Sequence, residues 1–441
     1  MDSELFEALG EWLRIPSVST EGGDAAALAA AADWAISRVR SAGGTAEAVV
    51  IGNGHPLVVG ELRSSDPAAP TVLIYGHYDV QSTGPLAAWT SPPFEPQTRD
   101  GRLYARGASD DKGNFLPLLH VACEMARSGE LPVHVRVLIE GEEEANGDAV
   151  ATWIRADERG ADVAIVFDSA MADADTPAIT VGLRGMVSAE IRVTTAERNL
   201  HSGLYGGSVL NALHVLHAAL AGVLPDAEGR VPAPLRAGAR PPAEAELASW
   251  RRLMPGGRAI GEVGGRPVSA GADEEFYLRT GAQPALDVNH MSGGERRTVV
   301  PASAEASVTL RLAPGQDPEA MRAELERLLR DALPDGADLE ITFHTAEPAL
   351  FDVDEPALQL AAQALHRACG VEPAFVRSGG SIPIVAEMAA RGYPVIVSGF
   401  ALPEDAIHAP DESFALRSLE WGTAAARELY LSLAALPPRG R

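Results

Sequence analysis

Cysteine and long apolar segments are in short supply in this 441-residue chain. Only two cysteines occur, Cys123 and Cys369, and their spacing matches neither a metal-binding nor a redox motif. This excludes a disulfide framework and predicts two ordinary thiols in a reducing compartment. No apolar run approaches the length of a membrane span, and the acidic segment 1–20 lacks the basic and apolar regions of a secretory signal. We therefore expect a cytoplasmic protein that does not enter a membrane.

Positive charge is the second shortage. Lysine is scarce, and 36 lysines and arginines face 61 aspartates and glutamates, which gives a formal net charge of −25. Binding to nucleic acid requires clustered lysine and arginine opposite the phosphates, so we expect no nucleic-acid partner. Aromatic residues make up only 5% of the chain, but 46% hydrophobic residues are enough for a large core and two domains. Small molecules, metal ions and other proteins remain as partners.

The two ends of the chain show the alternation of an α/β domain. Residues 24–44 are rich in alanine and stop at a glycine pair, which predicts a helix. Short β-branched runs at 71–80, 133–144 and 161–170 alternate with helical stretches, and the pattern resumes after residue 350. Strands that alternate with helices predict a central sheet with helices packed on it.

The middle of the chain has a different pattern. Its predicted elements are a strand at 186–195, a helix at 208–224, a strand at 305–313, a helix at 317–333 and a strand at 337–345. Two β-α-β units of this kind predict a small sheet with two helices on one face, of the split βαβ, ferredoxin-like type. A proline-, glycine- and alanine-rich segment from about 225 to 298 has no regular pattern. We therefore expect an α/β domain with a central mixed sheet, formed by residues 1–185 and 350–441 and interrupted by an α+β domain at 186–349.

Polar side chains that a core disfavours stand where the apolar runs end. They are His77 and Asp79 after "VLIYG", Glu140 and the run Glu142, Glu143 and Glu144 after "VRVLI", Asp168 after "VAIVF", and His408 in the loop beyond "VIVSGF". Asp110 and Asp111 lie in a glycine-flanked loop ahead of a helix. Each has an ordinary explanation as a turn residue, a helix cap or a solvated acidic turn.

These residues have a joint explanation if the predicted sheet is open. Side chains just beyond the carboxyl ends of parallel strands converge in one crevice although they are far apart in sequence. Several carboxylates this close cannot remain ionised together without cations, because like charges raise each other's pKa. Two divalent metal ions would compensate the charge, and imidazole with carboxylate ligands favours zinc, with manganese or cobalt as alternatives. One metal site explains five coincidences that the turn and cap explanations treat separately.

The order and spacing of these motifs resemble those of a known family, the co-catalytic zinc metallopeptidases that include aminoacylases, carnosinase-like dipeptidases, acetylornithine deacetylase and succinyl-diaminopimelate desuccinylase. The resemblance extends over nearly the whole chain, through "IPSVS" (15–19), "GHYDV", "ARGASDDKG", "EGEEE", "GLRG" (182–185), "LHSGLYGG" (200–207), "TVVP" (298–301), "LRLAP", "GGSIP" (379–383) and "AIHAPDE". The segments "YGHYDVQ", "HSGLYGG" and "GGSIP" are most similar to the branch near the cytosolic non-specific dipeptidases.

The resemblance implies a role for each residue of the metal site. The implied ligands are His77 and Asp168 for one metal, Glu144 and His408 for the other, and Asp110 as the bridge. Asp79 is implied to orient the imidazole of His77. Glu143, which is adjacent to a ligand but is not a ligand itself, is implied to be the general base. Glu142 would take that role if the register were shifted by one residue.

The inserted domain is implied to complete the active site. His201 of the "HSG" motif is implied to stabilise an oxyanion in the other subunit of a homodimer, although by itself it reads as a cap of the glycine-rich turn. Arg311 matches the position that binds the substrate's terminal carboxylate, to which a guanidinium is suited. Further implied substrate contacts are Thr298, Gly379, Gly380 and Ser381.

The implied reaction is hydrolysis of an amide bond in a dipeptide or a short peptide. A water shared by two metal ions would supply a hydroxide near neutral pH, and Glu143 would take its proton and deliver it to the departing amine. An N-acyl-amino-acid deacylase with the same metals and base is the alternative among enzymes, and no single residue distinguishes the two. The alternative outside enzymes is a metal-loaded binding or scaffold protein. The presence of Glu143 beside a full ligand set argues against this alternative.

Overall fold

The computed structural model describes residues 2–380 and 382–437, which divide into two compact units. The first unit contains the described residues up to Val181, then Phe351–Val376 and those from Ile384 onward. The second unit contains Gly182–Leu350 and the described part of Arg377–Pro383. Each unit is described by itself.

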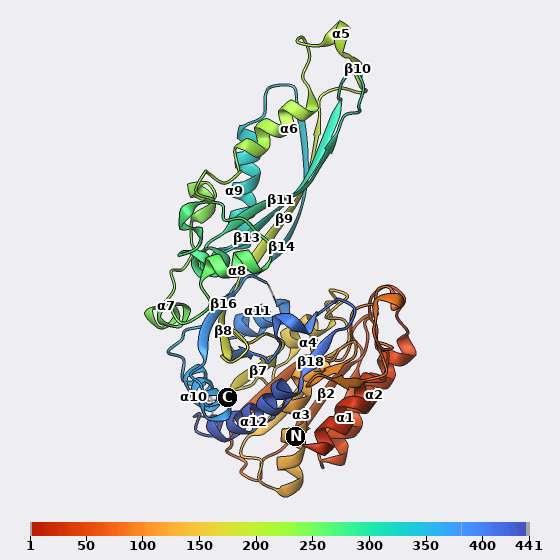
Figure 1. Ribbon diagram of the computed structural model, residues 1–441, viewed down its shortest axis with the longest axis vertical. Helices are drawn as coiled ribbons and strands as arrows, with labels where there is room; N and C mark the ends of the chain where they lie inside the picture. Colours follow the sequence, from red (N-terminus) through yellow and green to blue (C-terminus); the bar gives the residue numbers. More distant parts are fainter. Residues whose placement is uncertain (1, 381, 438–441) are drawn as a thin grey trace. The chain divides into compact units, whose positions relative to one another are not determined.

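A mixed sheet, with nine strands among the described residues, runs through the first unit (Figure 1). Its strands lie in the order β1 (Thr45–Val49), β2 (Leu57–Leu62), β6 (His134–Glu140), β3 (Thr71–His77), β7 (Val163–Phe167), β17 (Val395–Ser398), β8 (Ala178–Leu183) and β15 (Ala349–Leu350), and β16 (Ala374–Ser378) pairs with β8. The inner strands β6, β3, β7 and β17 run parallel, and β3 and β7 are buried throughout. Parallel strands covered on both faces are apolar along their length, which explains why "TVLIYG" does not alternate. The predicted α/β class with a central mixed sheet is confirmed.

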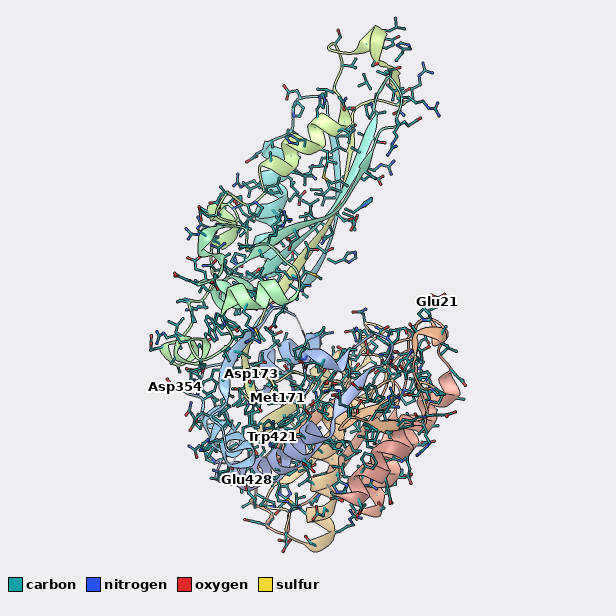
Figure 2. The ribbon with its side chains drawn as sticks, in the orientation of Figure 1. Glu21, Met171, Asp173, Asp354, Trp421 and Glu428 are labelled. Carbon is teal, nitrogen blue, oxygen red and sulfur yellow. The ribbon has the colours of Figure 1, made fainter. Side chains whose placement is uncertain are left out.

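Helices flank this sheet. They are α1 (Ser3–Leu13), α2 (Ala25–Ser41), α3 (Lys112–Ser128), α4 (Ala149–Ala156), α10 (Pro356–Cys369), α11 (Pro383–Ala390) and α12 (Leu416–Leu433). At the start of α2, Asp24 accepts a hydrogen bond from the backbone N–H of Ala26, and Gly129 ends α3 with a φ of 74°. Arg367 of α10 donates a hydrogen bond to Glu428 of α12 (2.6 Å). Glu428 is labelled in Figure 2. None of the helices in the described part of the chain is both long and apolar enough to cross a membrane.

The second unit is built on an antiparallel sheet. Its described strands lie in the order β11 (Ala285–Gly293), β13 (Ser303–Leu312), β9 (Gly185–Thr194) and β14 (Asp338–Ala346). Helices α6 (Ala212–Ala221) and α9 (Pro318–Asp331) pack on one face of it (Figure 1). Alternate residues of β9, such as Val187 and Ile191, are buried in a core with Leu216 of α6 and Leu325 of α9. This is the α+β arrangement that the alternation of strands and helices predicted.

The sequence pattern did not predict β11, which lies inside the segment 225–298. The same segment contains the short helices α7 (Glu244–Trp250) and α8 (Gly256–Glu262), which the sequence pattern did not predict either. In β11 only Leu286 is buried, because the strand lies at the edge of the sheet and most of its side chains face solvent. A strand of this kind has no alternation of apolar and polar residues from which it can be recognised.

A buried ion pair in the first unit leads to a prediction about stability. Arg136 of β6 donates hydrogen bonds to both carboxylate oxygens of Asp157 (2.7 and 2.9 Å), and the two side chains are only 4% and 5% exposed. We expect Asp157→Asn to lower the free energy of unfolding by about 3–5 kcal/mol, because the guanidinium is left buried without a counter-charge. Urea unfolding followed by circular dichroism measures this loss.

The exposed pair between Arg417 and Asp175 in the same unit is the control, with side chains that are 57% and 72% exposed. Asp175→Asn should change the free energy of unfolding by no more than about 1 kcal/mol. Equal losses in the two variants would contradict the prediction.

Candidate metal centre

The parallel strands bring the predicted ligands to one edge of the sheet. His77 is the last residue of β3, Asp168 follows β7 directly, and Glu144 lies in the turn after β6. Asp110 precedes α3, and His408 lies in the loop ahead of β18 (Ser413–Ala415). These positions follow from the topology, because the carboxyl ends of parallel strands lie at the same edge of a sheet.

The five residues form two groups that share Asp110. Ligand atoms of His77, Asp110 and Asp168 lie within 4.8 Å of one another, and so do those of Asp110, Glu144 and His408. Nε2 of His77 lies 3.0 Å from Oδ1 of Asp110, and Nε2 of His408 lies 3.0 Å from Oδ2. Nε2 of His408 is also 3.2 Å from Oε2 of Glu144. Asp110 therefore turns one oxygen toward each histidine, which is the geometry of a carboxylate able to bridge two cations.

The gathered charges perturb several pKa values. Burial alone would lower the pKa of His77, but the hydrogen bond with Asp110 raises it well above its usual range. Hydrogen bonds with Asp110 and Glu144 raise the pKa of His408 to about 10. Burial raises the pKa of Asp168 to about 8, with the nearby carboxylates adding to the shift despite the opposing effect of His77. Protons on these groups offset the crowded negative charge, and divalent cations bound in the same place would take over that task.

The donor set fits two divalent metal ions. Imidazole nitrogen together with carboxylate oxygen suits zinc, and also manganese or cobalt. Oε1 of Glu144 is buried and has no hydrogen-bond partner among the residues that the structure describes. A buried carboxylate oxygen without a donor is unfavourable unless a cation binds it, so this oxygen also favours a metal site.

The structure distinguishes Glu143 from Glu142. Oε1 of Glu142 accepts a hydrogen bond from the backbone N–H of His55 (2.9 Å), so this carboxylate is already engaged. Burial raises the pKa of Glu143, and the charges of Asp110 and Glu144 raise it further against the opposing effect of His77. Within residues 2–380 and 382–437, the side chain of Glu143 makes no hydrogen bond. Glu143 thus lies within the field of the ligand group with its carboxylate available, as a general base requires.

Asp79 contacts two ligand segments at once. Nδ1 of His77 lies 3.0 Å from the backbone oxygen of Asp79 and 3.4 Å from its Oδ1, so the main-chain oxygen is the better acceptor. Oδ2 of Asp79 accepts hydrogen bonds from the hydroxyl of Ser19 (2.6 Å) and from the backbone N–H of Glu144 (3.1 Å). That the Asp79 carboxylate orients His77 stays a prediction, and the same carboxylate also holds the segment that carries Glu144.

The predicted oxyanion residue His201 and the predicted substrate contact Thr298 lie together at one end of the second unit. His201 belongs to β10 (Leu200–His201), which pairs with β12 (Val299–Val300). The backbone oxygen of Thr298 accepts hydrogen bonds from the N–H (3.1 Å) and the hydroxyl (2.8 Å) of Ser202. Nδ1 of His201 accepts a hydrogen bond from the N–H of Gly203 (3.1 Å), which is the capping arrangement considered from the sequence. This cap leaves Nε2 of His201 for a different partner.

The other predicted substrate contacts gather around an arginine that the sequence patterns did not single out, Arg184 of the "GLRG" motif. Burial and the charge of Arg311 lower the pKa of Arg184 to about 10 against the opposing effect of Asp287, and Arg311 of β13 pairs with Met186, two residues after Arg184. Nε of Arg184 donates a hydrogen bond to the backbone oxygen of Gly379 (3.4 Å). Gly380 follows with its N–H bonded to the hydroxyl of Ser378 (3.2 Å), and Ser381 lies outside the described residues. In the sequence, Arg184 was identified only as part of the "GLRG" motif, and no role was predicted for it.

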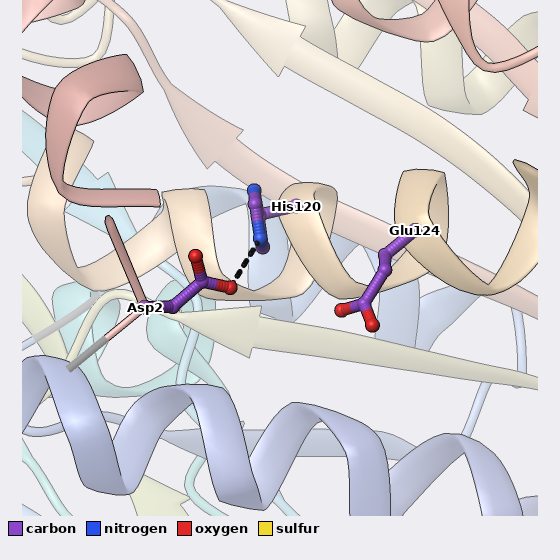
Figure 3. A group of neighbouring side chains, drawn as sticks. All are labelled: Asp2, His120 and Glu124. Carbon is purple, nitrogen blue, oxygen red and sulfur yellow. Dashed lines mark hydrogen bonds and ion pairs between the residues drawn. The ribbon is translucent and has the colours of Figure 1, made fainter. Parts of the chain in front are cut away.

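A third group of potential ligands consists of Asp2, His120 and Glu124 in the first unit (Figure 3). Nε2 of His120 lies 3.0 Å from Oδ2 of Asp2, and its Nδ1 lies 3.1 Å from Nη2 of Arg38. Glu124 is paired with Arg427 (2.7 Å). Arginines already supply the positive charge here, so a structural ion-pair network accounts for this group.

Comparison with known proteins extends these observations. The family described as Peptidase family M20/M25/M40 matches residues 73–432, that is 360 of the 441 residues. The chain is 30% identical over 380 residues to the cysteinylglycine-S-conjugate dipeptidase of Corynebacterium striatum, covering 82% of this chain and 81% of that protein. It is 28% identical over 346 residues to the Beta-Ala-His dipeptidase of Homo sapiens, covering 75% and 68%.

Solved structures agree with this relationship. The crystal structure of the M20 family metallo-carboxypeptidase Sso-CP2 from Sulfolobus solfataricus is similar with a TM-score of 0.82 at 26% identity, over 99% of this chain and 100% of that one. Since the family match covers most of the sequence and includes all five candidate ligands, the chain belongs to peptidase family M20/M25/M40.

Proposed function

We propose that this protein is a metal-dependent dipeptidase that hydrolyses the amide bond of dipeptides or very short peptides. The observation that carries the proposal is the pair of ligand groups that share Asp110, with Glu143 beside them. Two of the relatives are named dipeptidases, of cysteinylglycine S-conjugates and of Beta-Ala-His, which supports a dipeptide as the substrate. The metal is proposed to be zinc, with manganese or cobalt as alternatives.

The proposed mechanism assigns a distinct task to each residue. Two divalent cations, when bound, supply the Lewis acidity that activates water and polarises the scissile carbonyl. The residues that would hold them are His77, Asp168, Glu144 and His408, with Asp110 shared. Glu143 accepts the proton that the attacking water loses and returns it to the nitrogen as the C–N bond breaks, so the amine leaves neutral. Asp79 keeps the His77 and Glu144 segments in place.

The second unit is proposed to bind the substrate. Arg311 would receive the terminal carboxylate, because a guanidinium donates two parallel hydrogen bonds to a carboxylate. The backbone of Gly379 and Gly380 would contact the rest of the substrate. A buried ion pair anchors this loop, since Arg377, just before it, donates to both carboxylate oxygens of Glu246 (2.6 and 2.9 Å).

The proposal includes a homodimer in which His201 acts on the substrate of the other subunit. β12 adjoins the Ser303 end of β13, whereas Arg311 lies near the opposite end of this strand. At about 3.3 Å per residue, roughly 26 Å separates Ser303 from Arg311. A dipeptide spans only about 7 Å, which supports the proposal that His201 and Arg311 of one chain contact different substrates. A cytoplasmic location is also part of the proposal, supported by the free thiols of Cys123 and Cys369.

The function is tested by removing metal with a chelator, restoring Zn²⁺, Mn²⁺ or Co²⁺, and assaying a panel of dipeptides beside matched N-acetyl amino acids. We expect metal to restore dipeptide turnover and Glu143→Gln to lower kcat about 100- to 10,000-fold, because the amide cannot carry the proton. Glu142→Gln is the matched control and should retain turnover. Turnover of N-acetyl amino acids alone would reassign the protein as a deacylase, and metal binding without any turnover would support a binding protein.

The sharing of Asp110 leads to a prediction about metal content. His408→Ala should leave about one ion per chain, because the group of His77, Asp110 and Asp168 remains intact. Asp110→Asn should weaken the binding of both ions, because it removes charge from both groups. Metal analysis after equilibrium dialysis measures these stoichiometries. Two tightly bound ions in both variants would rule out the assigned ligands.

The contribution of two subunits is tested by mixing two inactive variants. His201→Ala and Glu143→Gln should each be nearly inactive alone, but their heterodimer contains one active site with an intact Glu143 and the partner's intact histidine. We expect unfolding and refolding of an equimolar mixture to restore roughly a quarter of wild-type activity, since half of the dimers are mixed and each has one complete site. No recovery, although mixed dimers form, would place His201 in the active site of its own chain.

A further inference from the structure

The carboxylate of Glu412 lies inside the loop that presents Asp110, and it is fully buried. Its Oε2 accepts hydrogen bonds from Nη1 of Arg106 (2.6 Å) and the backbone N–H of Gly107 (2.9 Å). Its Oε1 accepts hydrogen bonds from the backbone N–H groups of Ser109 (2.9 Å) and Asp110 (3.1 Å). A carboxylate has about four acceptor positions, so these donors satisfy it and the loop is folded around it.

The same residues hold the loop that carries His408. Nη2 of Arg106, whose side chain is paired with Glu412, donates a hydrogen bond to the backbone oxygen of Ala409 (3.3 Å). His408 has a φ of 62°, a left-handed conformation that is unfavourable for a residue with a Cβ. Contacts on the neighbouring residues are therefore needed to keep the imidazole in place.

Two further contacts join these loops. The backbone N–H of Ala105 donates a hydrogen bond to the backbone oxygen of Glu412 (3.1 Å), which continues the pairing of β5 (Arg102–Tyr104) with β18. The hydroxyl of Ser109 donates to the carboxylate of Asp405 (2.7 Å), three residues before His408. The loop that ends at Asp110 and the loop around His408 are thus joined at several points.

We infer that Glu412 is a positioning residue of the metal centre, which sets the place of Asp110 relative to His408 without contacting a metal ion. Asp110 lies 3.0 Å from both histidines, and a small movement of its backbone would lengthen one of these separations. Side chains that orient metal ligands commonly contribute tenfold to a hundredfold to metal affinity. This inference rests on the metal centre of the proposed function and is independent of the substrate.

Glu412→Gln tests the inference. The amide keeps one acceptor oxygen, but its NH₂ group cannot accept the hydrogen bonds that the second carboxylate oxygen accepts in the wild-type protein. We expect stripped protein titrated with Zn²⁺ by calorimetry to bind the more weakly held ion about tenfold to a hundredfold less tightly than wild type. Because the Zn²⁺ affinity is lower, dipeptide turnover at limiting Zn²⁺ should also fall, and it should recover when the concentration of free Zn²⁺ is raised. A purely structural defect would not recover in this way.

Asp157→Asn is the matched control, because it removes the charge from a buried arginine–carboxylate pair of the same unit that does not touch the ligand loops. It should lower stability but leave Zn²⁺ affinity within about twofold of wild type. Arg106→Lys is the second variant, which decides the question if Glu412→Gln does not fold. Arg106→Lys keeps a cation opposite Glu412 but loses the contact with Ala409. It should weaken the binding of the more weakly held Zn²⁺ ion severalfold.

Wild-type Zn²⁺ affinity in the folded variants of Glu412 and Arg106, or an equal loss in Asp157→Asn, would overturn this inference and leave the proposed function standing. A wild-type protein that binds two Zn²⁺ ions but hydrolyses no dipeptide would overturn the proposed function alone. Failure of the wild-type protein to bind Zn²⁺, Mn²⁺ and Co²⁺ would overturn both.

Discussion

The concentration of carboxylates at the carboxyl ends of β3, β6 and β7 is the constraint on which the rest of this site depends. Burial and mutual repulsion raise the pKa values of Asp168 and Glu143, whereas His77 and His408 hold Asp110 in its ionised form against the effect of burial. Such a group is stable only if protons or cations offset its charge. The packing of the fold offsets the cost of assembling these charges, and divalent cations held by these residues would supply the Lewis acidity that activates water.

Precise placement of this group comes from side chains that are not ligands. Asp79 and Glu412 each use a buried carboxylate to accept hydrogen bonds from the backbone of a ligand segment. Lys112, directly after the Asp110–Asp111 pair, is fully buried and donates to the backbone oxygens of Trp12 and Ile15 (3.0 Å each). It is the one lysine of the chain, and it fastens the start of α3 to the end of α1. Backbone contacts of this kind restrict a ligand more than side-chain packing alone, because they fix the main chain from which the ligand projects.

The second unit contributes cationic and main-chain groups, whereas the first gathers anionic ones. The charge of Arg311 helps to lower the pKa of Arg184, and Asp287 opposes this effect only in part, so a bound anion would stabilise the pair further. The terminal carboxylate of a peptide is an anion of the appropriate size and geometry. The proposed function therefore assigns recognition of substrate and activation of water to different cores. The long strand β13 carries Arg311 far from the His201 end of its own unit.

By itself, the sequence determined the α/β class, the inserted α+β pattern and the candidate ligands of the metal centre. It could do so because buried parallel strands are apolar along their whole length, so a polar residue at the end of each run, such as His77 or Asp168, is conspicuous. The edge strand β11 escaped prediction because its side chains mostly face solvent and have no periodic pattern. Only the tertiary structure revealed the tasks of Glu412 and Arg184, because their partners are backbone atoms and side chains up to 306 residues away, brought near by the packing of loops that no local pattern encodes.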